Sequence, residues 1–169
     1  QMAMDEATGK LVLQLDADEV LDRELTTFIS NLKRQAGANT LPDQPVAWYL
    51  KRKNHLFNRW LSKGGQYPDP VIRLYIRGKA RLPQKDVHEQ MVVDGEVATA
   101  DGHLLHYSYP TFADYLHKFN TYTSFAALQL VSERGASTRL PSIFSYVCIK
   151  PLHTFFSLYL RHRGYVDGM

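Results

Sequence analysis

Near the start of the chain, the apolar positions change from a continuous run to a helical period. The run from Leu11 to Leu15 ends at Asp16, and it predicts a strand buried on both faces, as in parallel sheets that helices cover. The next apolar positions recur at helical spacing, and they are Leu21, Leu25, Phe28, Ile29 and Leu32. They predict a helix that Asp22 caps and Gly37 ends.

The pattern then predicts strands separated by a loop. Val46–Leu50 predicts a second strand, and residues 54–70, which mix aromatic residues with glycine and proline, predict a long loop. Residues 71–77 alternate between apolar and polar positions, so we expect a half-exposed strand there. The polar face of that strand is expected to carry Arg73, Tyr75 and Arg77.

A hairpin and a long helix are predicted further along. Residues 91–98 contain an Asp94-Gly95 turn and predict a hairpin, and Leu104–Tyr107 predicts a short strand that ends near a histidine. Thr111 and Asp114 have the spacing of a capping box and predict the start of a long helix, which Gly135 is expected to end.

The last residues are rich in large apolar side chains. Pro151 interrupts the stretch from Leu140 to Leu160, so we expect two short aromatic helices with basic residues at their edges. Such helices can lie in a membrane interface, where cations meet anionic lipid, and residues 140–163 are our candidate for that contact. The alternative is a helical pair packed on the sheet or in a dimer. No uninterrupted apolar run approaches the roughly 20 residues of a spanning helix.

Composition and charge fit a folded globular protein. The chain has 169 residues, 44% hydrophobic and 22% charged, which is enough for one ordinary domain. A single cysteine, Cys148, excludes an internal disulfide and a cysteine-based zinc site. Residues 51–81 hold nine Lys or Arg and one acid, whereas residues 1–35 hold seven acids and four bases. The two segments can together frame a site for a metal-bound polyanion, although a basic segment by itself is more often a solvated face.

Asp16 and Asp18 are the first candidates for chemistry, because they follow the first strand at its carboxyl end. Ligands bind at that end in open α/β sheets, and both carboxylates can reach one divalent cation. His106 can add an imidazole ligand, which suits Mn²⁺ better than Mg²⁺, although a lone histidine is more often a core residue. Arg73, Arg52 and Lys53 are candidates for binding a diphosphate.

Several motifs in order resemble the family 2 glycosyltransferases related to lipopolysaccharide core glucosyltransferases. They are Leu15-Asp16-Ala17-Asp18-Glu19, Tyr67-Pro68-Asp69 with Arg73-Leu74, Val87-His88-Glu89, Leu104-Leu105-His106-Tyr107-Ser108-Tyr109 and Gly164-Tyr165-Val166-Asp167-Gly168. The resemblance implies a GT-A fold, in which a mixed sheet is flanked by helices. On this view residues 1–138 are part of the catalytic domain, residues 139–169 are a C-terminal amphipathic segment, and an N-terminal βα portion of the family domain is missing.

The resemblance also implies an activity and its partners. Expected are a nucleotide-sugar donor, most simply a UDP-sugar, a divalent cation (Mg²⁺ or Mn²⁺), and transfer with inversion to a hydroxyl of a glycolipid or lipopolysaccharide-core acceptor. Glu89 matches the position of the catalytic base, and His88 beside it can orient Glu89 or contact a phosphate. Asp18 is expected on the metal and Asp16 near the ribose, and the protein is expected on the inner face of the cytoplasmic membrane.

Two other function classes fit part of the sequence. An acid pair after an apolar strand also occurs in haloacid-dehalogenase-like phosphatases, but the later Ser or Thr, Lys and second acidic pair of that class do not follow in order. A nucleic-acid-binding module using the basic, aromatic residues 51–81 leaves the acids after the first strand without a purpose.

Overall fold

The computed structural model describes Met4 and residues 6–82, 91–134 and 140–168. The chain forms two compact units, the first from residues 1–53 and 68–106 and the second from residues 54–67 and 107–169. The elements in chain order are β1 (Leu11–Leu13), β2 (Glu19–Leu21), α2 (Arg23–Gly37), β3 (Ala47–Leu56), β4 (Arg59–Trp60), β5 (Asp69–Ile76), β6 (Ala80–Arg81), β7 (Val92–Val93), β8 (Val97–Tyr109), α3 (Phe112–Arg134), α4 (Leu140–Phe144), η1 (Ser145–Ile149), α5 (Lys150–Phe156), η2 (Ser157–Arg161) and η3 (Gly164–Asp167).

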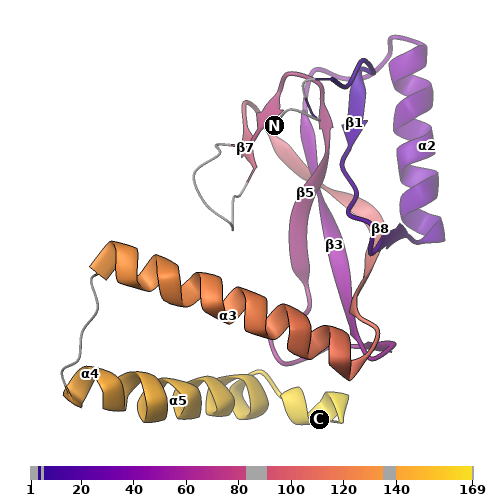
Figure 1. Cartoon of the computed structure of the whole chain (residues 1–169). Coiled ribbons are helices and arrows are strands. Elements are labelled where there is room, and N and C mark those ends of the chain that lie inside the picture. Colours follow the sequence, from indigo (N-terminus) through magenta and orange to yellow (C-terminus); the bar gives the residue numbers. More distant parts are fainter. Residues whose placement is uncertain (1–3, 5, 83–90, 135–139, 169) are drawn as a thin grey trace. The chain divides into compact units, whose positions relative to one another are not determined.

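The main sheet is mixed, and its strand order is β1-β5-β3-β8-β2, with β4 paired to β3 (Figure 1). Strand β5 is antiparallel to both β1 and β3, and β2 is antiparallel to β8. Hydrogen bonds from Val46 N–H to the Glu96 carbonyl and from Phe57 N–H to the Tyr109 carbonyl indicate that β3 and β8 run in the same direction. This sheet with its helices confirms the predicted α/β class and is compatible with a GT-A-like fold.

The first strand forms, but the prediction that it is buried on both faces is wrong. Strand β1 is an edge strand of three half-buried residues and pairs with β5 alone. Leu15, which follows it, is exposed. A short apolar run has the same appearance in a central strand and at an edge, so the pattern could not separate the two.

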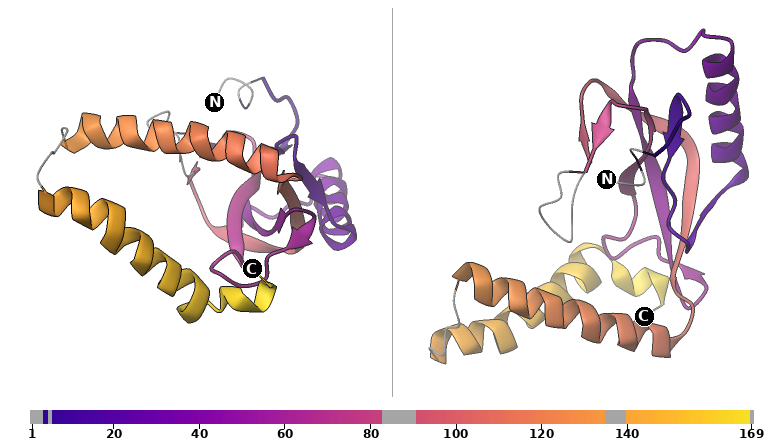
Figure 2. Two further views of the ribbon diagram at one scale, coloured as in Figure 1. Left: turned by 60° about the horizontal axis from the view of Figure 1, so that its bottom comes forward. Right: turned by 45° about the horizontal axis from the view of Figure 1, so that its top comes forward.

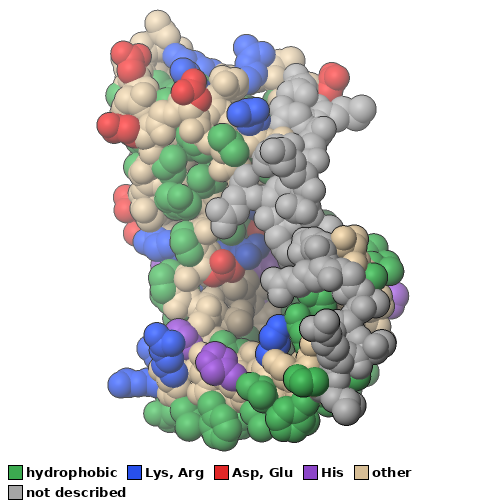
Figure 3. All heavy atoms as spheres, turned by 90° about the vertical axis from the view of Figure 1, so that its left-hand side faces the viewer, with side chains coloured by type: hydrophobic (Ala, Val, Ile, Leu, Met, Phe, Trp, Pro, Cys, Tyr) green, Lys and Arg blue, Asp and Glu red, His purple; other side chains and the backbone are tan. Residues whose placement is uncertain are grey.

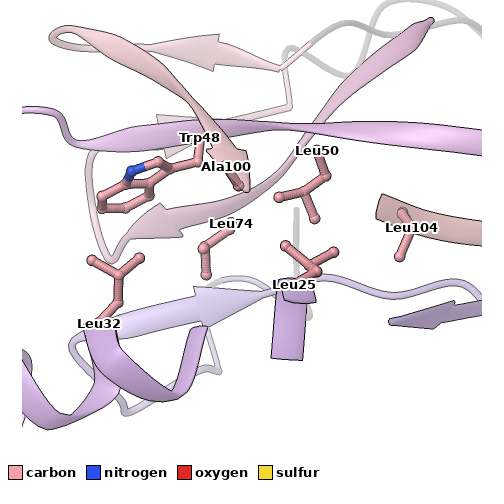
Figure 4. Packing of buried hydrophobic residues seen from close by; sticks show 7 residues of the cluster. All are labelled: Leu25, Leu32, Trp48, Leu50, Leu74, Ala100 and Leu104. Atoms are coloured by element: carbon pink, nitrogen blue, oxygen red, sulfur yellow. The ribbon is translucent and has the colours of Figure 1, made fainter. Parts of the chain in front are cut away.

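Helix α2 forms the core of the first unit with the sheet. The Asp22 carboxylate accepts a hydrogen bond from Leu25 N–H at 2.8 Å, which confirms the predicted N-cap, and the helix ends at Gly37. Leu25 and Leu32 point from α2 toward side chains of the sheet (Figure 4). The buried cluster consists of Leu25, Leu32, Trp48, Leu50, Leu74, Ala100 and Leu104.

Three other strand predictions need correction. Strand β3 continues beyond the predicted end at Leu50 to Leu56, and β4 (Arg59–Trp60) lies within residues 54–70, so part of the predicted loop is strand. Tyr75, placed on an exposed polar face, is buried in a second cluster with Met4 and Ala47, because the second face of β5 is also covered. Strand β7 pairs with β6 and not with the start of β8, so the predicted hairpin is wrong.

Helix α3 begins as predicted, and the tail differs from the prediction. Thr111 and Asp114 form the capping box, in which Asp114 N–H donates to the Thr111 hydroxyl at 3.2 Å and Thr111 N–H donates to the Asp114 carboxylate at 3.2 Å. Gly135, the expected end of α3, lies outside the described residues. Residues 140–161 form one continuous helical rod through Pro151, shown in gold in Figure 2.

A π-helical turn before Pro151 explains why the helical tail is continuous. The five residues before α5 form a wide π-helical turn, so Pro151 enters α5 in its first turn, where its missing N–H costs little. Pro141–Arg161 is therefore 21 residues long with mean hydropathy 1.2, long and apolar enough by length and composition to cross a membrane. The expectation that no segment reaches this length is corrected.

Candidate functional site

Asp16 and Arg73, both predicted as donor-binding residues, form an ion pair in the first unit. Asp16 follows β1, and Arg73 lies on β5, the neighbour of β1. Arg73 Nη2 also lies 3.2 Å from Glu19 Oε1, so one guanidinium contacts two carboxylates. The sheet thus brings an acid and a base that are 57 positions apart in the chain to one point.

Arg52 joins the same group of charges from β3. Its Nε and Nη2 donate to Asp69 Oδ2 at 2.9 Å and 2.7 Å, and its Nη1 lies 3.6 Å from Glu19 Oε1. Lys53 is the next residue of β3. The charge cluster, as we call it, therefore contains Asp16, Asp18, Glu19, Asp69, Arg52, Arg73 and His106.

Asp18 and His106 are the predicted metal ligands, and they lie close together. His106 Nε2 is 3.6 Å from Asp18 Oδ1, because Glu19 on β2 is in register with His106 on β8. The side chain of Asp18 is one third exposed, which leaves its carboxylate accessible to a cation from solvent. The predicted catalytic residues His88 and Glu89 lie outside the described residues.

The buried Nε of Arg73, a member of the charge cluster, has no hydrogen-bond partner among the described residues. The same is true of the buried Oε1 of Gln14, whose backbone N–H donates to the Arg73 carbonyl. Buried polar groups in folded proteins are almost always hydrogen-bonded, so these atoms indicate that a polar group outside the described residues belongs here.

The donor atoms of the charge cluster fit a hard divalent cation. Mg²⁺ is commonly held by one or two carboxylates together with phosphate oxygens, and Mn²⁺ also accepts an imidazole. Asp18 and His106 offer such a pair, with Asp16 nearby in the same turn. They do not form a group of three ligand atoms within 4.8 Å of one another.

That closer grouping occurs, among the described residues, at Asp22, Glu24 and His103. Asp22 caps α2 there, and its other oxygen lies 3.2 Å from His103 Nδ1. Burial by itself raises the pKa of Asp22. Hydrogen bonds from Leu25 and His103 lower the pKa by more than burial raises it, so the pKa of Asp22 lies below its ordinary value. These contacts explain why Asp22, Glu24 and His103 lie close together: they stabilise the start of α2.

No protein-family model matches this chain, and no solved structure matches it. The chain is similar to a known glycosyltransferase. The relative is the lipopolysaccharide core biosynthesis glycosyltransferase LpsC of Rhizobium meliloti (strain 1021), with 29% identity over 179 aligned positions. The alignment covers 100% of this chain and 62% of the relative, so the chain spans less than two thirds of the relative's length. This similarity supports the glycosyltransferase relationship that the motifs predict.

The two other function classes are not favoured. Arg52 and Arg73, two of the nine basic residues in the segment 51–81 that a nucleic-acid-binding surface would use, are each paired with carboxylates. The similarity to a glycosyltransferase along the whole chain gives no support to a phosphatase.

Glu19 and Asp69 are the residues of the charge cluster to which the sequence assigned no role, and Glu19 is the buried one. The sequence predicted Asp22 as the helix cap, and Asp22 has that role. The side chain of Glu19 is instead fully buried, with two arginines within 3.6 Å. A clue in the sequence was the position of Glu19 at the start of a second apolar segment, where a carboxylate facing inward needs cationic partners.

Proposed function

We propose that this protein is an inverting glycosyltransferase that moves a sugar from a nucleotide-sugar donor, such as a UDP-sugar, to a hydroxyl of a glycolipid or lipopolysaccharide-core acceptor. The observation that carries the proposal is the charge cluster: of the residues predicted as donor and metal ligands, Asp16 pairs with Arg73 and Asp18 lies 3.6 Å from His106, and Glu19 connects the two pairs through its contact with Arg73 and its register with His106. The relative's function is consistent with this activity.

The charges of the cluster favour a divalent cation. With neutral His106, four carboxylates (Asp16, Asp18, Glu19 and Asp69) and two guanidiniums (Arg52 and Arg73) give a net charge of −2. A diphosphate is repelled by such a site unless positive charge accompanies it. Mg²⁺ or Mn²⁺ held by Asp18 and His106 would supply that charge and stabilise the leaving diphosphate as a Lewis acid.

The residues of the chain have separate parts in the reaction. The guanidinium N–H groups of Arg73 donate to a diphosphate oxygen, and Asp16 binds the ribose. The acceptor oxygen bonds to the anomeric carbon from the side opposite the diphosphate, whose bond to that carbon breaks and leaves its electron pair on oxygen. Glu89 takes the proton of the acceptor hydroxyl as general base, and His88 orients Glu89.

The reaction is proposed to take place on the inner face of the cytoplasmic membrane, to which the helical tail binds. Phe144, Val147, Leu152 and Phe155 each expose more than half of their surface. Figure 3 shows hydrophobic side chains gathered at the lower end of the view, over the helices of the second unit. From Arg134 to Val166 the sequence has no acid, and its five Lys and Arg complement the charge of an anionic bilayer.

The tail is proposed to lie in the plane of the membrane and not to span it. Its polar residues recur every three or four positions as one stripe along the rod, formed by Ser142, Tyr146, Lys150, His153, Ser157 and Arg161. Lys150, in the middle of the rod, would sit in hydrocarbon in a spanning helix, at a cost of about 2.5–3.5 kcal/mol. In the plane of the interface its ammonium stays among headgroups beside the Tyr146 ring, whose centroid is 3.5 Å away.

The transfer reaction is tested by screening nucleotide sugars for release of nucleoside diphosphate with Mn²⁺, Mg²⁺ or a chelator. Turnover should require the cation and be lost in Asp18→Ala, and Glu89→Gln should lower kcat by about 10²–10⁴-fold. The exposed Asp94→Ala is the matched control and should be unaffected. Hydrolysis of simple phosphate esters that Asp16→Asn abolishes, without sugar transfer, would contradict the proposal and favour a phosphatase.

Membrane binding is tested by co-sedimentation with phosphatidylcholine vesicles that contain or lack phosphatidylglycerol. Binding should require the anionic lipid, fall with salt, and weaken in Lys150→Glu and Phe155→Ser but not in the α2 control Lys33→Glu. An alkaline carbonate wash should release the protein. Retention after that wash would show that the tail spans the membrane.

A further inference from the structure

Glu19 differs from the other acids of the charge cluster in its burial. Its side chain is 0% exposed, whereas that of Asp16 is 50% exposed and those of Asp18 and Asp69 about one third. A buried carboxylate is costly unless cations and hydrogen bonds compensate it. The contacts of Glu19 therefore show what its charge is used for.

Glu19 connects three segments of the first unit. Its Oε2 accepts a hydrogen bond from Asp16 N–H at 3.0 Å, and Glu19 N–H donates to the Asp16 carbonyl at 3.1 Å, so the turn that contains Asp18 is closed from both sides. Its Oε1 lies 3.2 Å from Arg73 Nη2 on β5 and 3.6 Å from Arg52 Nη1 on β3. One side chain thus fixes the acidic turn and both arginines.

Each arginine has one buried partner and one exposed partner. Arg73 contacts buried Glu19 and half-exposed Asp16, and Arg52 contacts buried Glu19 and partly exposed Asp69. Pairs at the solvent-exposed side are weak and exchange readily, whereas pairs with a buried partner are costly to break. An incoming anion can therefore replace Asp16 and Asp69 while Glu19 keeps both guanidiniums in place.

We propose that Glu19 is a positioning residue for donor binding: its buried carboxylate holds Arg73 and Arg52 while their exposed partners are exchanged for the diphosphate. The inference rests on the proposed transfer function and deepens it. Asp16, released from Arg73, then becomes free to bind the ribose. Glu19 itself touches neither the donor nor the reacting atoms.

The test measures binding of inorganic pyrophosphate with Mg²⁺ by calorimetry, and KM and kcat for the donor. Glu19→Gln keeps the length of the side chain and an acceptor for Asp16 N–H but loses the charge. It should weaken pyrophosphate binding and raise donor KM about tenfold, with a smaller change in kcat. Glu96→Gln, an exposed glutamate with the same substitution, is the matched control and should change neither.

A double-mutant cycle with Arg73→Lys separates positioning from general stability. If Glu19 acts through the arginines, Glu19→Gln should lose less pyrophosphate affinity once Arg73 is lysine than it does in the wild type, and the remaining loss should come from Arg52. Additive losses, or a Glu19→Gln protein with lowered Tm but unchanged affinity and KM, would overturn the inference and leave the transfer function intact. A wild-type protein that neither binds pyrophosphate nor turns over any donor would overturn both.

Should Glu19→Gln not fold, the arginines provide a second route. Arg73→Lys and Arg52→Lys retain a charge for Glu19 but lose the fork that holds a second partner. Each should weaken pyrophosphate binding, whereas the exposed α2 control Arg34→Lys should not. Unchanged affinity in both arginine variants would overturn the inference.

Discussion

Asp167 near the C-terminus should be essential for holding the end of the tail within the second unit. The side chain is buried, and its carboxylate accepts three hydrogen bonds from the segment after β4. Oδ1 accepts from Ser62 N–H at 3.1 Å and from the Ser62 hydroxyl at 2.8 Å, and Oδ2 accepts from Lys63 N–H at 2.7 Å. Asp167→Ala removes both acceptor oxygens, and with them the three hydrogen bonds, and leaves the N–H groups of Ser62 and Lys63 without this partner.

The magnitude follows from these contacts. A hydrogen bond to a charged group contributes about 1.5–3 kcal/mol, and each buried N–H left unsatisfied costs about 1–3 kcal/mol. The three bonds share one carboxylate and are not additive, so we expect a total loss of about 3–5 kcal/mol, as when one member of a buried charged pair is removed. Because 1.4 kcal/mol corresponds to about a tenfold change, local opening should become at least about 10²-fold more frequent.

Hydrogen exchange read by mass spectrometry measures this opening directly. Peptides covering residues 58–68 and 162–168 should exchange faster in Asp167→Ala, whereas peptides of α2 should keep their protection, since opening is local. Asp94→Ala is the control, because its carboxylate is exposed and its pair with Lys79 has a 3.7 Å separation. Unchanged protection at Ser62 and Lys63 in Asp167→Ala would refute the reasoning.

Substitutions at the start of α2, and unfolding at low pH, test how much other buried or capping contacts contribute to stability. Asp22→Ala should lower the free energy of unfolding in urea by about 1 kcal/mol, and Glu96→Ala should leave it unchanged. Gly102→Ala should cost more than about 2 kcal/mol in the same assay, because Gly102 has φ +86° and a Cβ there would lie 2.2 Å from Leu25 N; an unchanged urea midpoint would contradict this. Burial raises the pKa of Asp22 and of Asp167, but their hydrogen bonds leave each pKa below 3.8, so their stabilisation is complete above pH 3.8 and is lost as the pH falls through the folded values. Asp167→Asn should therefore flatten the acid limb of an unfolding curve followed by circular dichroism, and an identical limb would count against the assignment.

Local signals in the sequence predicted helix starts correctly, because a cap is made within four residues. Asp22 before α2 and Thr111 with Asp114 before α3 are recognisable without any knowledge of the rest of the chain. Strand partners are different, since they depend on distant residues. The apolar run of β1 could not show that β1 lies at an edge, and the Asp94-Gly95 turn could not show that β7 pairs with β6.

The tail shows a third reason why sequence-based prediction failed. Pro151 is a reliable signal of interruption in an isolated helix, but the wide turn at Ser145–Ile149 lets the rod continue through it. The sequence has no marked signal for a π-helical turn. The prediction of two short helices therefore failed at their junction, while the apolar and basic character of the segment, which composition alone determines, is unchanged.

The candidate site contains both features that the sequence shows and features that depend on distant strands, within the four consecutive residues 16–19. Asp16, Asp18 and Glu19 were recognisable as an acidic group, yet they have three different environments, because the turn ends one strand and starts another. Asp16 faces Arg73 from the segment that follows β1, Asp18 lies in the turn near His106, and the pairing of β2 with β8 places Glu19 on the inside. Only the register of strands that are far apart in the chain decides which acid is buried between two arginines. A sequence motif of alternating acids can therefore indicate that a site exists, while the division of its acids into exchangeable and fixed partners has to come from the fold.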